Sequence, residues 1–87
     1  MPRVFIPPTM RSLTHGREII DASGANVREA LEDIENQFPG IMDRLCQDGS
    51  IRPDVSLVVG GGISTLGLLQ PVEQDTEIHF LPAISGG

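Results

Sequence analysis

The sequence contains no lysine, and its six basic residues are all arginine. The chain therefore has no side-chain amine, and in any amide linkage between proteins we expect it to act as the donor. Its single cysteine, Cys46, excludes an internal disulfide and a zinc site with several cysteine ligands. One cysteine suits a reducing compartment, so we expect a cytoplasmic protein.

The chain also lacks a long hydrophobic run. Its longest, at 55–62, is interrupted by Ser56 and is far too short to span a bilayer. Residues 1–8 lack the apolar segment of a signal peptide, and we expect no membrane contact. Twelve acidic residues against six arginines give a net charge of −6. This charge argues against a nucleic-acid partner and favours a partner protein with a basic face.

One helix is strongly indicated near the middle of the chain. Asn26 and Glu29 have the spacing of a capping box. Pro39-Gly40 ends the helix, because the residue before a proline is disfavoured in the helical conformation. Between these signals, apolar residues recur at helical spacing and form one stripe, which consists of Val27, Ala30, Leu31, Ile34 and Phe38.

Short apolar segments surround this helix. They predict strands at 3–6, 17–22, 55–59, 63–65 and 76–81, with a short turn at 41–46 and irregular chain at 9–16 and 66–72. The order strand, strand, helix, strand, strand, strand predicts an α+β protein. We expect a ubiquitin-like β-grasp fold, in which one main helix packs across a mixed sheet of about four to five strands. The two terminal strands should lie side by side in the middle of the sheet.

Residues able to carry out catalysis are few. His15, His79 and Cys46 do not have the spacing of metal ligands. We interpret them as a loop residue, a sheet-face residue and a buried structural thiol. The helix carboxylates fit a solvated face, and Gly60-Gly61-Gly62 fits a hairpin turn better than a phosphate-binding loop. We therefore expect no bound cofactor, no metal and no catalytic activity of the chain itself.

The sequence ends in Gly86-Gly87, shortly after a strand that Pro82 closes. We predict one domain at 1–82 and a flexible tail at 83–87. Because glycine has no Cβ, such a tail can thread a narrow channel in another protein. In that case Ile84, Ser85 and Gly86 pass through the channel, and the carboxylate of Gly87 reaches an active site. The alternative is a frayed terminus without a function.

Residues 75–87 combine an acidic turn, an apolar strand, Leu81-Pro82 and Gly86-Gly87. This segment resembles the end of the ubiquitin-like sulfur carriers of the MoaD/ThiS type. The rest of the chain is similar to the branch that serves cysteine biosynthesis. The matching features are Ile6-Pro7 with Thr9 and Arg11, Ala22-Ser23-Gly24, Asp33-Ile34-Glu35, and Gly40-Ile41 with Arg44-Leu45. At Gly60-Gly61-Gly62, such carriers more often have an Asn-Gly or Asn-Asp turn.

The resemblance implies a protein substrate and not an enzyme. A ubiquitin-activating-type enzyme would use ATP to adenylate the carboxylate of Gly87. A sulfur donor would then displace AMP and leave a thiocarboxylate, whose sulfur passes to a sulfur-accepting synthase. Cysteine synthesis is the first choice of pathway, before molybdopterin and thiamine. The alternatives are a ubiquitin-like modifier conjugated to lysines of target proteins and a non-covalent adaptor with an idle tail.

Strand alternation predicts the surface that partners would contact. Val4, Ile6, Ile78 and Phe80 should face the helix, together with Val55, Leu57 and Val59. Phe5, Val58 and Leu81 should then lie on the opposite face of the sheet as an exposed apolar patch that leads to the tail. The alternative is that residues 7–16 fold over this face. We expect the protein alone to be a monomer.

Overall fold

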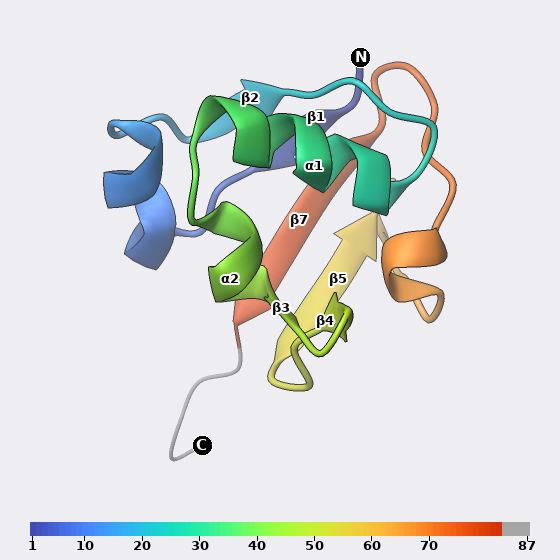
Figure 1. Cartoon of the computed structure of the whole chain (residues 1–87). Helices are drawn as coiled ribbons and strands as arrows, with labels where there is room; N and C mark the ends of the chain where they lie inside the picture. Colours follow the sequence, from blue (N-terminus) through green and yellow to red (C-terminus); the bar gives the residue numbers. More distant parts are fainter. Residues whose placement is uncertain (83–87) are drawn as a thin grey trace.

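The computed structural model describes residues 1–82, which form a five-stranded mixed sheet with one main helix packed across it (Figure 1). The strand order is β2 (Ile19–Asp21), β1 (Arg3–Phe5), β7 (Glu77–Pro82), β5 (Val55–Val59) and β6 (Gly62–Ile63). β1 and β7 are parallel, and every other pair in this sheet is antiparallel. The predicted β-grasp fold is confirmed, and the terminal strands are neighbours in the middle of the sheet.

The main helix, α1 (Val27–Gln37), begins at the predicted cap. The Oδ1 atom of Asn26 accepts a hydrogen bond from the N–H of Glu29 at 2.9 Å. The Glu29 carboxylate in turn accepts one from the N–H of Ala25, also at 2.9 Å. The first bond satisfies a backbone donor that the first helical turn leaves free, and the second ties the helix to the residue before its cap. The sequence pattern therefore fixes where the helix starts and which face it buries.

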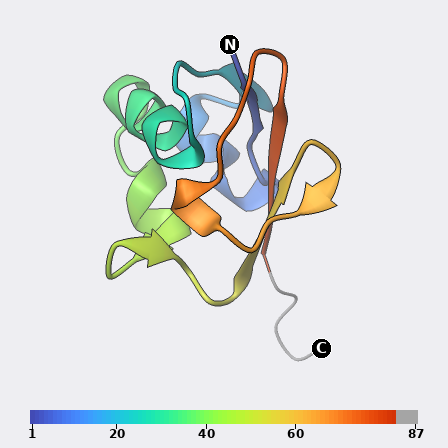
Figure 2. The same cartoon turned by 90° about the vertical axis from the view of Figure 1, so that its right-hand side faces the viewer.

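The core lies between α1 and the inner face of the sheet (Figure 2). From the sheet, Val4, Ile6, Ile78, Phe80 and Leu57 are each at most 3% exposed, as the alternation predicts. Val55 and Val59 are half-buried and pack against this core. From the helix, the buried residues are Val27, Ala30, Leu31 and Ile34. Burial of these side chains is the main favourable contribution to folding.

The connection between the first two strands differs from the prediction. Residues 9–16 were expected to be irregular, but η1 (Pro8–Thr14) is a 3₁₀ helix. Proline is accepted at a first helical position, where its missing N–H has no partner to lose. Thr14 is fully buried, and its hydroxyl donates to the carbonyl oxygen of Arg17 at 2.8 Å. Met10 is buried in the same core.

The segment after α1 also contains more structure than predicted. The expected turn at 41–46 is a short helix, α2 (Ile41–Leu45), and a small hairpin of β3 (Cys46–Gln47) and β4 (Ser50–Ile51) follows it. Asp48 and Gly49 both have positive φ, which suits the two central positions of a tight hairpin turn. The irregular segment predicted at 66–72 contains a second 3₁₀ helix, η2 (Gly67–Leu69).

Strand ends were predicted to within about two residues. β6 begins inside the glycine run at Gly62 and ends at Ile63, instead of covering 63–65, and the hairpin turn is therefore at Gly60-Gly61. Among residues 1–82, no helix is both long enough and apolar enough to cross a bilayer.

Glu35 joins α1 to α2. Its carboxylate accepts hydrogen bonds from the N–H of Gly40 at 3.0 Å and from the N–H of Met42 at 2.9 Å. The backbone N–H groups of Met42 and Gly40 hold the pKa of this carboxyl below its usual value. The charged carboxylate therefore stabilises the turn between the two helices.

We expect Glu35→Gln to lower the free energy of unfolding by about 1 kcal/mol at pH 7, because an amide oxygen accepts these bonds less strongly. A lowered folded-state pKa stabilises the fold above the unfolded value of about 4.3. This stabilisation disappears as the pH falls through the folded-state pKa. Denaturant unfolding at pH 7 and pH 3 should show a difference between wild type and variant that shrinks at pH 3. Glu32→Gln, on the exposed face of α1, is the control. An equal difference at both pH values contradicts this role of the charge.

Candidate functional site

The face of the sheet opposite α1 carries a row of side chains that crosses all five strands. Strand register places Ile19 opposite Phe5, Phe5 opposite His79, His79 opposite Val58, and Val58 opposite Ile63. Residues directly opposite one another in a sheet project to the same face. Four of the five side chains are apolar, and the fifth, His79, lies in the centre.

His79 is held between neighbours on this face. Its ring stacks on the ring of Phe5, with centroids 4.1 Å apart and an interplanar angle of 13°. Its Nε2 atom lies 3.4 Å from a carboxylate oxygen of Glu77, two residues earlier on the same strand. The imidazole is thus positioned by an aromatic contact and a carboxylate, and it lies between Phe5 and Val58 in the row.

The polarity of this face changes along β7. At the start of the strand, Glu77 lies opposite Arg3, and Arg3 lies opposite Asp21, so this end is charged. Next comes the row through His79, and then Leu81, which is 54% exposed. The surface therefore becomes apolar toward the end of β7, which is the end from which the chain continues into residues 83–87.

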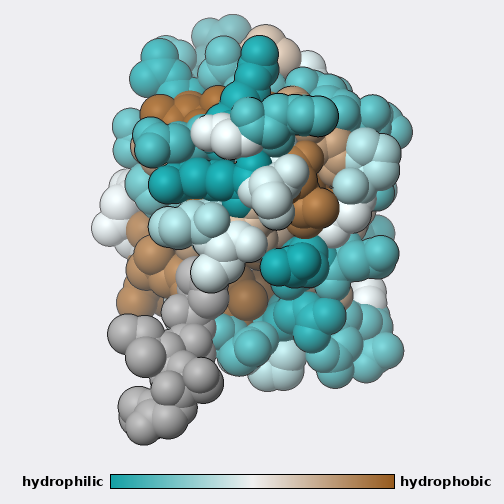
Figure 3. Space-filling model, turned by 90° about the vertical axis from the view of Figure 1, so that its left-hand side faces the viewer, coloured by the Kyte–Doolittle hydropathy of each residue, from teal (hydrophilic) through white to brown (hydrophobic). Residues whose placement is uncertain are grey.

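We define the outer patch as Phe5, Ile19, Val58, Ile63 and Leu81. Ile19 and Ile63 are 47% and 78% exposed, whereas Phe5 and Val58 are half-buried. Figure 3 shows hydrophobic residues gathered at the lower left of its view, near the place where the described residues end. A contiguous apolar surface on a small protein marks a contact surface for another protein more often than isolated apolar residues do.

A small hollow of about 180 Å³ adjoins the outer patch. Phe5, Leu81 and His79 line one side of it, and Pro8 and Arg11 of η1 line the other. The Arg11 guanidinium is fixed by the carbonyl oxygen of Ile6, to which its Nε–H donates at 3.2 Å, and by Glu18 at 3.4 Å. η1 therefore borders the outer face and leaves Leu81 exposed. The alternative that residues 7–16 cover this face is wrong.

The structure brings Phe5, Val58 and Leu81 together on one face, as the alternation predicts. The other predicted site residues, Ile84, Ser85, Gly86 and Gly87, lie outside the described residues. Sequence reasoning missed Ile19 and Ile63. Their place in the row depends on register between strands that are distant in sequence, which no local pattern reveals.

The remaining reactive side chains do not assemble into a site. His15 follows η1 as its cap residue, and His79 is on the sheet face, as interpreted from the sequence. Cys46, expected to be a buried thiol, is half-buried, and this burial raises the pKa of its thiol despite the opposing effect of Arg28 and Arg52. A raised pKa makes a cysteine a weaker nucleophile at neutral pH. Within residues 1–82, no three His, Cys, Asp or Glu side chains are placed to hold a metal ion.

The sequence model of the ThiS family matches residues 4–87, which is almost the whole chain. The chain belongs to the ThiS family. It is 28% identical to the sulfur carrier protein CysO of Mycobacterium tuberculosis in an alignment 94 residues long, gaps included, which covers 97% of this chain and 96% of that protein.

Solved structures agree with this family membership. A chain of the Amycolatopsis orientalis BexX/CysO complex superposes with a TM-score of 0.93, at 29% identity and with 100% of both chains covered. SAMP1 of Haloferax volcanii superposes with a TM-score of 0.75 at 20% identity, covering 99% of this chain and 98% of that one. The likeness to SAMP1 concerns the fold alone. In this ThiS-family chain, the outer patch lies on the sheet face next to the strand that leads into the Gly-Gly segment.

Proposed function

We propose that this ThiS-family protein is a sulfur carrier whose reactive group is the carboxylate of Gly87. Three observations support this: the family match through residue 87, the Gly86-Gly87 pair that this match includes, and an apolar surface that borders the end of β7. The outer patch is the structural observation that supports the proposal. A carrier must be recognised by the enzymes that modify it, and its own fold need only present the tail.

The chemistry divides between the carrier and its partners. An ATP-dependent adenylating enzyme of the ubiquitin-activating type converts the Gly87 carboxylate into an acyl-adenylate and releases pyrophosphate. A donor that supplies sulfur at the oxidation level of sulfide then displaces AMP and leaves a thiocarboxylate. Adenylation is needed because a carboxylate oxygen is a poor leaving group and AMP is a good one. A sulfur-accepting synthase uses the thiocarboxylate sulfur as a nucleophile toward its own substrate, and water then cleaves the acyl–sulfur bond and regenerates the carboxylate.

Residues 84–86 act in this proposal by the size of their side chains. Ser85 and Gly86 allow the chain to enter a narrow channel, and Ile84 fills its wider entrance. Phe5, Val58 and Leu81, extended by Ile19 and Ile63, form the docking surface that places the tail. Cofactors belong to the partners: ATP is consumed by the activating enzyme. Cysteine biosynthesis is the pathway we propose first, because the chain resembles CysO proteins along almost its whole length.

Intact mass spectrometry of the protein purified gently from its native host tests the function. We expect a species in which one terminal oxygen is replaced by sulfur, and tandem fragmentation should locate the change at Gly87. A chain that lacks Gly86-Gly87, expressed in the same host, is the control and should show no such species. Gly87 found in adducts with lysines of other proteins, without any thiocarboxylate, would instead identify a ubiquitin-like modifier. Because the chain has no lysine, such a modifier would not build chains on its own side chains.

A further inference from the structure

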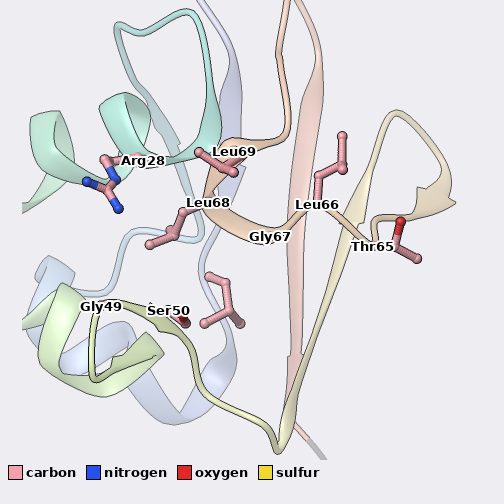
Figure 4. A pocket seen from close by; sticks show the side chains of 9 residues that line it. Arg28, Gly49, Ser50, Thr65, Leu66, Gly67, Leu68 and Leu69 are labelled. Carbon is pink, nitrogen blue, oxygen red and sulfur yellow. The ribbon is translucent and has the colours of Figure 1, made fainter.

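A second concave surface lies on the α1 side of the sheet, away from the outer patch. Residues of η2 and of the β3–β4 hairpin line it, and both elements lie on the same side of the sheet as α1 (Figure 2). The cavity measures about 410 Å³ and includes residues of α1, β4 and η2 (Figure 4). We define this groove by Arg28, Ser50, Ile51, Leu66, Leu68 and Leu69.

The groove is apolar at its base and at part of its rim. Leu68 is only 7% exposed and belongs to the core, and Ile51 is half-buried against that core. Leu66 and Leu69, on either side of Leu68, are 54% and 71% exposed. Single exposed leucines are ordinary on protein surfaces. Two of them beside a hollow with an apolar base form a surface that can bury an aliphatic side chain of another molecule.

Arg28 adds a positive charge to this groove. It lies in the first turn of α1, is exposed, and has no carboxylate within 4.0 Å among residues 1–82, whereas Arg11 is paired with Glu18. Figure 4 shows its side chain reaching from α1 toward Leu68. A positive charge near the start of a helix is unfavourable, because the helix dipole is positive there. A carboxylate from outside would relieve this repulsion and complement the guanidinium.

The backbone beside the groove favours an extended ligand. β4 pairs only with β3 in the described sheet topology, so its second edge carries no neighbouring strand. Such an edge leaves backbone N–H and C=O groups available to another extended segment. Ser50 and Ile51 of β4 both line the groove.

We propose that the groove is a second docking site, which binds an extended acidic segment of a partner protein. An aliphatic side chain of that segment packs on Leu66 and Leu69, and a neighbouring carboxylate pairs with Arg28. Because the groove and the outer patch lie on opposite sides of the sheet, a partner in the groove leaves the outer patch free. The protein can then be tethered to one partner while its tail is used by another. This inference does not depend on the sulfur chemistry.

Amide chemical shifts of the isotope-labelled full chain, titrated with two synthetic hexapeptides, test the proposal. The acidic probe is acetyl-Thr-Leu-Glu-Leu-Glu-Thr-amide, and its matched partner has lysine in place of both glutamates. We expect saturable shifts at Ser50, Ile51 and Leu69 with the acidic peptide only. Arg28→Glu should lower the affinity for the acidic peptide about tenfold or more and should allow the lysine peptide to bind. Arg17→Glu is an equal change of charge at an exposed residue outside the groove, and it should alter the binding of neither peptide.

Equal binding of both peptides would overturn the proposal, and so would the absence of saturable shifts in the groove. An Arg28→Glu variant that behaves like Arg17→Glu would also overturn it. Shifts of the groove residues that depend on protein concentration without any peptide would instead assign the groove to a contact with a second copy. Tail activation is measured separately, so failure of this proposal and failure of the proposed function are distinguishable.

Discussion

Leu81→Glu should abolish most of the adenylation of the Gly87 carboxylate by the activating enzyme, while the domain stays folded. Leu81 is exposed in the unbound protein, so a charged side chain at this position remains in water. In a complex that buries the outer patch, the same charge would be desolvated without a partner. Disruption of a residue that anchors an interface costs about 2 kcal/mol or more. That corresponds to about a thirtyfold loss of the efficiency of activation.

The assay is ATP–pyrophosphate exchange with the adenylating enzyme of the native host, over a range of carrier concentrations. Asn36→Glu, on the solvent face of α1, adds the same charge far from the outer patch and should leave exchange unchanged. Thermal unfolding of both variants should remain within a few degrees of the wild type, because neither position is in the core. Normal exchange by Leu81→Glu would show that the activating enzyme does not use the outer patch. Gly87 would still be the candidate reactive residue in that case.

The helix and the central strands could be predicted from the sequence because their signals are local. Asn26 and Glu29 stand three residues apart and cap the same turn. Val4 and Ile6 alternate with Phe5, and this period of two determines which side of the sheet each residue faces. The inner and outer faces of β1 and β7 follow directly from these patterns.

The β3–β4 hairpin was missed for the opposite reason. Each of its strands has two residues, so there is no alternation from which to recognise it. Asp48-Gly49 is a typical turn pair, but without flanking strands it indicates only a break in the chain. The groove that contains Ser50 and Ile51 could not have been predicted, because it depends on this hairpin lying against η2.

The full extent of the outer patch could not be predicted from the sequence pattern either. Phe5 and Val58 were assigned to it by alternation, whereas Ile19 and Ile63 join it through their cross-strand partners. A shift of one residue in either pairing would move these isoleucines to the other face. Register is fixed by burial of Ile20 and by the short turn at Gly60-Gly61, and both are properties of the folded chain.

Gly24→Ala should be among the most destabilising small substitutions in this protein. A Cβ atom at residue 24 would lie 2.6 Å from the backbone nitrogen of Ala30 and 2.8 Å from the Cβ of Glu29. Contacts this short with helix backbone cannot be relieved by a side-chain rotation, so the start of α1 must move. Overpacking of this kind costs about 1–3 kcal/mol. In a domain of this size, each kcal/mol lowers Tm by about 4–8 °C.

Gly62→Ala is the matched control, because an added Cβ meets no atom within 4 Å and the backbone does not have the positive φ that favours glycine. We expect it to be neutral or stabilising by up to about 1 kcal/mol, since alanine restricts the unfolded chain more than glycine does. Calorimetry of the two variants therefore separates the effect of the close approach from the general effect of replacing a glycine. If Gly24→Ala unfolds at the temperature of Gly62→Ala, residue 24 does not pack closely against the backbone of α1. A large loss confined to Gly24→Ala would show that the connection from β2 into α1 requires a residue without a side chain, which gives the glycine of Ala22-Ser23-Gly24 a role in packing.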